Sequence, residues 1–403
     1  MRIAYIVPYV PNLIRTRPFN LIGQLSALGH TVSVFTLGSS KQDSRDAQLL
    51  MSRCAEVHYQ TQPILNSLLS CAVAIPSHKP LQAVYSWNLR FAERMKNLLF
   101  GRESFTAFDV VHVEHLRGSQ YGRYIKARVP GIPVVWDSVD CISHLFRQAS
   151  NQSGSAFSKL ITSFELKRTE KAEGELMSVF DHVLVTSEID KKAMLDLVPD
   201  GLNPAPISVL SNGVDLEYYR PRQDIQRDPE TLVFSGKMSY HANISMVKYL
   251  VAEIMPKVWQ RRPGTRLVIV GKDPSADVQN LTRNPLVTVT GTVDDIRPYL
   301  WKATVAVVPL VYGAGIQNKI LEAMACGIPV VTTLRTTSSL QAKPGQDILV
   351  ADNPDEFAAM VLQLIEDPHL QYEIGNSGLR YVQKYHNWKQ IALDLIRVFQ
   401  KVN

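Results

Sequence analysis

A Gly-Ala-Gly segment at residues 313–315 is the strongest chemical signal in the chain. It follows an apolar run and precedes a predicted helix over 318–326, so the absent β-carbons would let a ligand approach the backbone closely. The free N–H groups of the first helical turn favour an anion, and Lys319 would add a positive charge. Glu322, one turn further on, could accept hydrogen bonds from two ribose hydroxyls. This pattern predicts a phosphate-binding loop; the alternative is a tight turn whose glycines serve only packing.

A dinucleotide site of the NAD or FAD type does not fit the same segment. Asn318 stands where its third glycine is needed, and no Asp or Glu occurs between Glu322 and Asp347 to hold the adenine ribose.

A second loop with Gly236 and Lys237 follows the predicted strand 231–235. Asn243 is placed to cap the helix that comes next. If this strand and the predicted strand 305–310 lie in one sheet, two lysines and two helix N-termini face one spot and predict a pyrophosphate site.

Polar residues also follow strands in the first third of the chain. Glu114 and His115 end a predicted strand over 110–113, and one of them could meet a substrate, although a histidine or glutamate at a strand end more often has a structural role. Asp137 follows another strand in the same way. Arg15 and Arg17 precede the first predicted helix, where they could meet an anion.

Composition restricts the class of protein. The 403 residues are 45% hydrophobic and 20% charged, which excludes a disordered, collagen-like or coiled-coil chain and suggests two or three globular domains. The apolar stretch 63–76 is too short to span a bilayer, and the N-terminus reads as a first strand and not as a signal peptide. Four cysteines show no metal or redox spacing, so reduced thiols in a cytoplasmic protein are expected.

Charge is unevenly distributed. The net charge is +6, and the first 130 residues carry 15 Lys and Arg against seven Asp and Glu. Such an excess suits nucleic acid, an anionic membrane or a phosphate-bearing substrate, and a solvated basic face explains it equally well.

Apolar runs alternate with helical patterns along the chain, which predicts an α/β protein with parallel sheets. Strands are expected at 3–7, 31–35, 110–113, 134–136, 182–185, 207–210, 231–235, 267–270, 287–290, 305–310 and 329–333, and helices at 18–28, 156–179, from 187, 244–260, 296–302, 318–326 and 388–401. The Pro-rich, charged segment 211–229 looks like a connection between two doubly wound domains, whose cleft would hold the ligand.

With these residues in view, the chain resembles the glycosyltransferases of family four, which have the GT-B architecture. The resemblance is carried by residues 211–221 (SNGVDLEYYRP), 290–293 (TGTV) and above all 315–330 (GIQNKILEAMACGIPV). The last segment, with 297–300 before it, is similar to bacterial sugar transferases from exopolysaccharide clusters, including those linked to the PEP-CTERM/exosortase system.

The resemblance implies two Rossmann-like doubly wound domains facing a central cleft. The expected bounds are 1–205 for an acceptor-side domain and 206–385 for a nucleotide-sugar donor domain, with 386–403 as a helix that returns to the first domain. It also implies retention of configuration, with neither a metal nor a prosthetic group.

Site residues carry over one by one. Lys237 is similar to the residue that contacts the donor diphosphate, Glu322 matches the ribose-binding glutamate, and the turn with Thr292 and Val293 looks like the one that borders the base. The remaining expected donor-binding residues are Gly236, Gly313, Ala314, Gly315, Ile316, Gln317, Asn318 and Lys319. The predicted catalytic residues are Lys237, Glu114 and His115, and Arg15, Arg17 and Asp137 are assigned to the acceptor or phosphate side.

Three positions depart from the family pattern. Ala314 stands where family members often carry a first glutamate, Ala242 where a second basic residue is common, and 11–15 replaces a glycine-rich loop. These departures concern the contacts to the donor sugar.

The expected function is transfer of a glycosyl group from a nucleotide-diphosphate sugar to a carbohydrate or lipid-linked acceptor, in polysaccharide or glycoconjugate biosynthesis. Positive charge would offset the charge that develops on the leaving diphosphate; a covalent route through Glu114 is the less favoured alternative. An anionic membrane on the inner face, met by 88–102 and 117–128, is a candidate partner, and nucleic acid is not expected. The rival functions are a catalytically silent GT-B subunit and a nucleotide-sugar epimerase.

Overall fold

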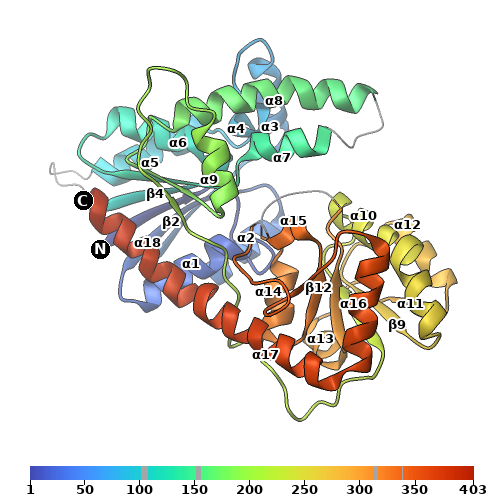
Figure 1. Ribbon diagram of the computed structural model, residues 1–403. Helices are drawn as coiled ribbons and strands as arrows, with labels where there is room; N and C mark the ends of the chain where they lie inside the picture. The colour runs from blue at the N-terminus through green and yellow to red at the C-terminus, as the bar shows by residue number, and fades with distance from the viewer. Residues whose placement is uncertain (101–107, 151–155, 312–315, 338) are drawn as a thin grey trace. The chain divides into compact units, whose positions relative to one another are not determined.

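The computed structural model describes residues 1–100, 108–150, 156–311, 316–337 and 339–403. They form two compact units (Figure 1), of which the first comprises Met1–Ser211 with Trp388–Asn403 and the second Asn212–Asn387. The expected boundaries lay at residues 205 and 385 instead.

The first unit is built on a parallel sheet of seven strands in the order β3-β2-β1-β4-β5-β6-β7. The order reverses between β1 and β4, so these two strands flank the topological switch point, where open α/β sheets bind ligands. The strands are β1 Arg2–Val7, β2 Thr31–Gly38, β3 Glu56–Thr61, β4 Val110–Glu114, β5 Val134–Val139, β6 His182–Val185 and β7 Ile207–Val209.

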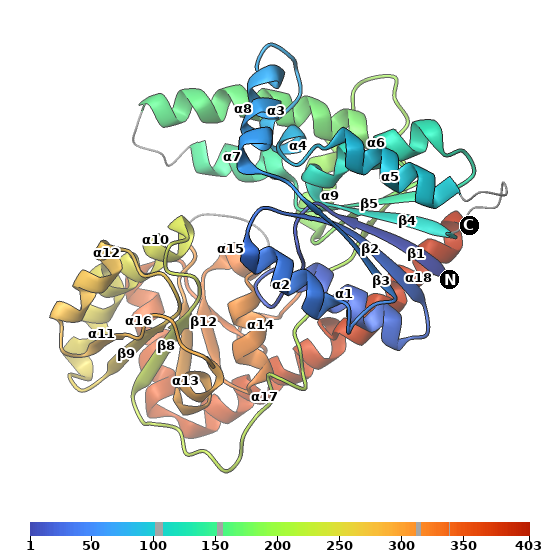
Figure 2. The same cartoon turned by 180° about the vertical axis from the view of Figure 1, so that it is seen from behind.

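Helices cover both faces of this sheet, which is why its central strands are largely apolar. Figures 1 and 2 show α3 through α8 on one side and α1 with α18 on the other. The apolar stripe of α18, with Trp388, Leu395 and Phe399, packs in one core with Leu21 of α1 and Ile3 of β1. The helices are α1 Thr16–Ala27, α2 Lys41–Leu50, α3 Ile64–Ala74, α4 Leu81–Tyr85, α5 Leu89–Phe100, α6 His115–Arg128, α7 Ile142–Ser150, α8 Ala156–Leu176, α9 Glu188–Leu195 and α18 Trp388–Val402.

The second unit has a parallel sheet of six strands in the order β10-β9-β8-β11-β12-β13, with its switch point between β8 and β11. The strands are β8 Thr231–Ser235, β9 Arg266–Val270, β10 Val287–Val289, β11 Val305–Val308, β12 Val330–Thr332 and β13 Leu349–Val350. The helices are α10 His241–Tyr249, α11 Met255–Arg261, α12 Ala276–Gln279, α13 Arg297–Lys302, α14 Asn318–Ala325, α15 Leu334–Thr337, α16 Pro354–Glu366 and α17 Pro368–Tyr385.

The predicted pair of doubly wound parallel sheets is confirmed, and one helix needs correction. The pattern predicted a single helix over 244–260 with Asn243 as its cap. In the structure α10 begins at His241 after Tyr240, and Asn243 lies inside the helix. A π-helical turn, Leu250–Ile254, then separates α10 from α11, whose second residue is Pro256. Since proline cannot donate a backbone hydrogen bond, it suits the first turn of a new segment.

All four cysteines are free thiols. In the parts of the chain that the structure describes, no helix is both long and apolar enough to cross a bilayer.

Candidate functional site

Two glycine turns lie side by side at the carboxyl ends of β8 and β9. The Gly236 N–H donates to the Val270 carbonyl oxygen at 2.9 Å. A β-carbon on Gly271, whose φ is 150°, would lie 1.7 Å from the Gly236 carbonyl oxygen. Backbone therefore packs directly on backbone, and only glycine fits at residue 271.

Asn243 ties the turn after β8 to the first turn of α14. Its side chain is 4% exposed; Nδ2 donates to the Lys237 carbonyl oxygen at 2.9 Å, and Oδ1 accepts from Lys319 Nζ at 3.0 Å. The two lysines were expected to lie close together if the strands that precede their loops belonged to one sheet. These strands, β8 and β11, are neighbours in the sheet of the second unit. The structure thus brings Lys319 next to the loop that carries Lys237.

Lys319 and Glu322 lie in surroundings that disfavour charge. Burial lowers the pKa of Lys319 to about 8, although the nearby Glu322 opposes the shift. Burial raises the pKa of Glu322 to about 6, against the effect of Lys319 and of a hydrogen bond from the Tyr219 hydroxyl. The lysine also stands over the Phe234 ring, 5.3 Å from its centroid. A cation in such a place gains strongly when an anion arrives.

Lys237 has a different environment. Its side chain is 51% exposed, and Nζ lies 3.9 Å from Asp273 Oδ2. An exposed pair at this distance is weak, so an incoming anion could displace the aspartate.

The remaining predicted donor residues are placed as follows. Gly313, Ala314 and Gly315 lie outside the described residues. Gln317 precedes α14 and accepts a hydrogen bond from Lys319 Nζ at 3.3 Å, while Asn318 is the first residue of that helix and Ile316 is buried.

Thr292 and Val293 line a surface depression of about 530 Å³ after β10. Asp295, which also lines the depression, is held by Arg297 of α13, whose guanidinium donates to it at 2.7 Å and lies 3.8 Å from the Tyr218 ring centroid. The predicted base-binding turn therefore has a concave, ordered border.

In the first unit, Glu114 ends β4 at the switch point and is 1% exposed. Its carboxylate accepts hydrogen bonds from the Tyr5 hydroxyl at 2.6 Å and from the Tyr9 hydroxyl at 2.7 Å. Burial and the charge of Asp137 raise its pKa to about 7. Both oxygens are therefore already held, and the group is partly protonated at neutral pH.

Arg17 and Asp137, which the sequence assigned to ligand contacts, bind each other. Arg17 donates from Nε and Nη2 to Asp137 Oδ2 at 3.0 and 2.8 Å, and from Nη1 to the Ser211 carbonyl oxygen at 3.2 Å. The two side chains are 6% and 0% exposed. This buried pair joins α1, β5 and the last residue of the first unit's main segment.

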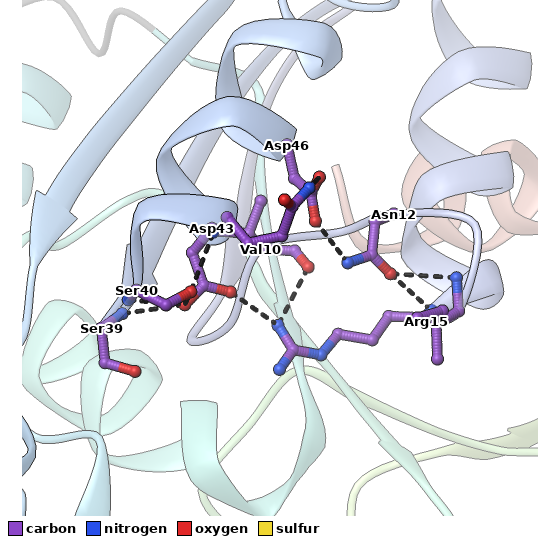
Figure 3. A network of polar contacts seen from close by, with 9 residues as sticks. Val10, Asn12, Arg15, Ser39, Ser40, Asp43 and Asp46 are labelled. Atoms are coloured by element: carbon purple, nitrogen blue, oxygen red, sulfur yellow. Dashed lines mark hydrogen bonds and ion pairs between the residues drawn. The ribbon is translucent and has the colours of Figure 1, made fainter. Parts of the chain in front are cut away.

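Arg15 lies in the polar network of the loop after β1 (Figure 3). Its Nη1 donates to the Val10 carbonyl oxygen at 3.1 Å and lies 3.7 Å from Asp43 Oδ1. Asn12 holds the loop by accepting from the Arg15 N–H at 2.9 Å. The guanidinium also stands 5.1 Å from the Tyr9 ring centroid, so the loop places a partly exposed cation beside one of the tyrosines that hold Glu114.

Two strand ends of the first unit have strained backbones. His115 after β4 and Val139 at the end of β5 have φ of 65° and 69°, a region that side chains rarely adopt, least of all β-branched ones. Burial, with the positive charge of Arg117, lowers the pKa of His115 to about 4, so its ring is neutral at pH 7. Strain at neighbouring strand ends is typical of functional sites.

The sequence did not indicate the roles of Tyr5, Tyr9, Tyr219 and Asn243. Tyr5 and Tyr9 offered one signal, a hydroxyl in or just after an otherwise apolar strand, which needs a buried acceptor. Within the described ranges, no three His, Cys, Asp or Glu side chains form a cluster that could hold a metal ion.

Two doubly wound domains, each with polar residues at its switch point, define the GT-B class of sugar transferases. Residues 15–218 match the family described as Glycosyltransferase Family 4, and residues 229–367 match Glycosyl transferases group 1. The chain belongs to glycosyltransferase family 4 and is a glycosyltransferase.

Known proteins agree with this assignment. D-inositol 3-phosphate glycosyltransferase 2 of Catenulispora acidiphila is 22% identical over 319 residues, which are 73% of this chain and 71% of that protein. The structure of sucrose-phosphate synthase from Thermosynechococcus elongatus superimposes with a TM-score of 0.68 at 18% identity, covering 100% of this chain and 98% of the other. Anabaena Alr3699/HepE in complex with UDP gives 0.64 at 14% identity, with complete coverage of both chains. These likenesses confirm the GT-B fold.

Proposed function

We propose that the protein transfers a glycosyl group from a nucleoside-diphosphate sugar to a carbohydrate or lipid-linked acceptor, with retention of configuration and without a metal ion. With acceptors of these two kinds, the reaction would belong to the synthesis of a polysaccharide or glycoconjugate in the cytoplasm.

The observation that carries this proposal is the arrangement at the switch point of the second unit. Two glycine turns pack against each other there, Asn243 holds Lys319 beside the turn that carries Lys237, and α10 and α14 begin at the same end of the sheet. Helix N-termini and cations together favour a diphosphate. The UDP complex of the structurally similar Alr3699/HepE supports the same class of donor.

The leaving group explains why cations are needed. As the bond to the sugar breaks, negative charge builds up on the nucleoside diphosphate, and fixed positive groups stabilise that charge. We assign this role to Lys237 and Lys319. Glu322 is assigned to the ribose hydroxyls, and Thr292 and Val293 to the base.

The surroundings of Glu114 support a reaction on the leaving-group face and not a covalent intermediate. A nucleophilic carboxylate has to be ionised and accessible. Glu114 is 1% exposed, accepts hydrogen bonds from two tyrosines and has its pKa raised to about 7. Its assigned role is to shape the acceptor side together with His115 and Arg15.

A product assay separates this function from its rivals. The purified protein is incubated with UDP-glucose and other sugar nucleotides, with and without saccharide or lipid-diphosphate acceptors. Release of nucleoside diphosphate that requires an acceptor indicates a transferase, and the anomeric signal of the product in NMR reports retention. Conversion of the donor alone would indicate an epimerase, and binding without any turnover a silent subunit.

A further inference from the structure

Helix α3, Ile64–Ala74, exposes its large apolar side chains to solvent and buries small side chains. It buries Ser67 and Ala74, which are 2% and 7% exposed, toward the protein. Its large apolar side chains and the residue that follows are each more than half exposed; they are Ile64, Leu65, Leu68, Leu69, Val73 and Ile75, named here the α3 apolar face.

These residues share one face because their spacing follows the helical repeat. No Lys, Arg, Asp or Glu occurs from residue 57 to residue 78, so no charge interrupts the surface. Monomeric soluble proteins rarely expose a contiguous apolar patch of this kind, and such patches mark interaction sites.

The helix is firmly held by its neighbours. Cys71 Sγ lies 3.7 Å from the Leu81 carbonyl oxygen of the segment that starts α4. Arg168 of α8 donates to the carbonyl oxygens of Ile75 and Lys79, at the end of the helix. Its guanidinium lies 3.8 Å from the centroid of the Phe164 ring of α8, which is itself 46% exposed. The fold therefore presents this face in a fixed position.

The helices on the same side of the sheet as this face carry more positive than negative charge. Residues 62–130 contain nine Lys and Arg against four Asp and Glu, and one of the four, Glu114, is buried. Arg90 and Arg94 of α5 and Arg123 of α6 are exposed. Figures 1 and 2 show these helices on the side of the sheet where α3 lies.

We propose that the α3 apolar face inserts into the surface of an anionic lipid bilayer. An apolar surface together with exposed basic residues on the same side of a domain is the combination that binds anionic membranes peripherally. With 11 residues, α3 is too short to cross the hydrocarbon core, so it lies in the interface. The surface differs from the basic segments 88–102 and 117–128 expected from the sequence, which supply charge but not the inserted element.

The position of α3 places the α3 apolar face at the same end of the sheet as the candidate acceptor side. It starts three residues after β3 ends at Thr61, and β3 and β4 are parallel strands of one sheet. The carboxyl ends of parallel strands lie at the same end of the sheet, so α3 starts at the end of the sheet where Glu114 lies. A lipid-linked acceptor would approach from the surface that α3 binds.

Co-sedimentation with vesicles tests the proposal on the full chain. The probes are vesicles of phosphatidylcholine alone and of an equal mixture of phosphatidylcholine and phosphatidylglycerol. The wild type is expected to bind the mixed vesicles more tightly, and less tightly as salt is added. The double substitution Leu65→Gln with Leu68→Gln is expected to weaken binding by roughly tenfold or more. Each substitution removes the favourable free energy of transferring a leucine side chain from water to hydrocarbon.

The matched control is Leu49→Gln with Met51→Gln at the end of α2, where the side chains are 67% and 57% exposed, close to the 66% and 55% of Leu65 and Leu68. It should bind vesicles like the wild type. A wild type that ignores mixed vesicles, or equal losses in both double variants, would overturn the proposal. So would a lipid-free wild-type dimer that Leu65→Gln with Leu68→Gln turns into a monomer, since the face would then join two copies of the chain. No sugar nucleotide is present, so the outcome does not depend on the proposed transfer reaction.

Discussion

Nucleotide affinity should fall as pH rises through the pKa of Lys319. Burial lowers that pKa to about 8, whereas an ordinary lysine keeps its proton to about pH 10. The charged form of the side chain binds a diphosphate much more tightly than the neutral form does. With a pKa of about 8, roughly nine tenths of the free protein carries this charge at pH 7 and roughly one tenth at pH 9. The expected loss of UDP affinity between these two pH values is therefore about tenfold, or about 1.4 kcal/mol.

Calorimetric titration with UDP at pH 7, 8 and 9 measures this dependence. The phosphates of UDP are fully ionised over most of this range, so the ligand contributes little to the change. Lys319→Arg keeps its charge throughout and should bind with nearly constant affinity. Lys319→Gln should bind more weakly and also without a slope. A flat wild-type profile, or a slope that persists in Lys319→Arg, would refute the assignment of this lysine to the diphosphate.

Three further substitutions follow from the contacts described above. Gly271→Ala should lower the free energy of unfolding by roughly 3 kcal/mol or more, because its β-carbon would meet the Gly236 carbonyl oxygen. Gly345→Ala shares a positive φ but meets nothing within 4 Å, so a loss of only about 1 kcal/mol is expected in urea unfolding; equal losses would contradict the clash. Glu114 has its folded pKa raised from 4.5 to about 7, so its contribution to stability is full below pH 4.5 and is lost as pH rises through 7. Glu114→Gln should gain stability relative to wild type between pH 5 and 8, and a constant difference would argue against the raised pKa. Asn243→Ala should destabilise the fold by about 1–3 kcal/mol and weaken UDP binding; unchanged affinity would deny that it positions the lysine.

The sheets were predictable because parallel strands buried on both faces are apolar runs. β1, β4 and β11 are of this kind, and their bounds agree with the prediction to within two residues. β3 was missed because it is an edge strand whose residues Glu56–Thr61 are exposed or half-buried and largely polar. Helix α3 was missed because its large apolar side chains face solvent. A sequence shows which residues share a face of a helix but not which face meets water.

The candidate site was predictable where it depends on topology alone. Lys237 and Lys319 follow or flank strands that pair in one sheet, and parallel strands end on one edge. The Arg17–Asp137 pair joins residues 120 positions apart, and Asn243, from inside α10, bridges the turn after β8 and the first turn of α14. Such contacts depend on tertiary packing, and no local pattern in one sequence encodes them.

Nucleotide binding tests the central claim most directly. Calorimetric titration with UDP, GDP and ADP is made on the wild type, Lys237→Ala and the matched control Lys248→Ala. Lys248 is 54% exposed and pairs with Asp277, much as Lys237 is 51% exposed and pairs with Asp273. One nucleotide should bind the wild type, and Lys237→Ala alone should weaken it by roughly tenfold or more, about 1.4 kcal/mol. If no nucleotide binds, or if both substitutions leave the affinity unchanged, the diphosphate site does not lie at this switch point.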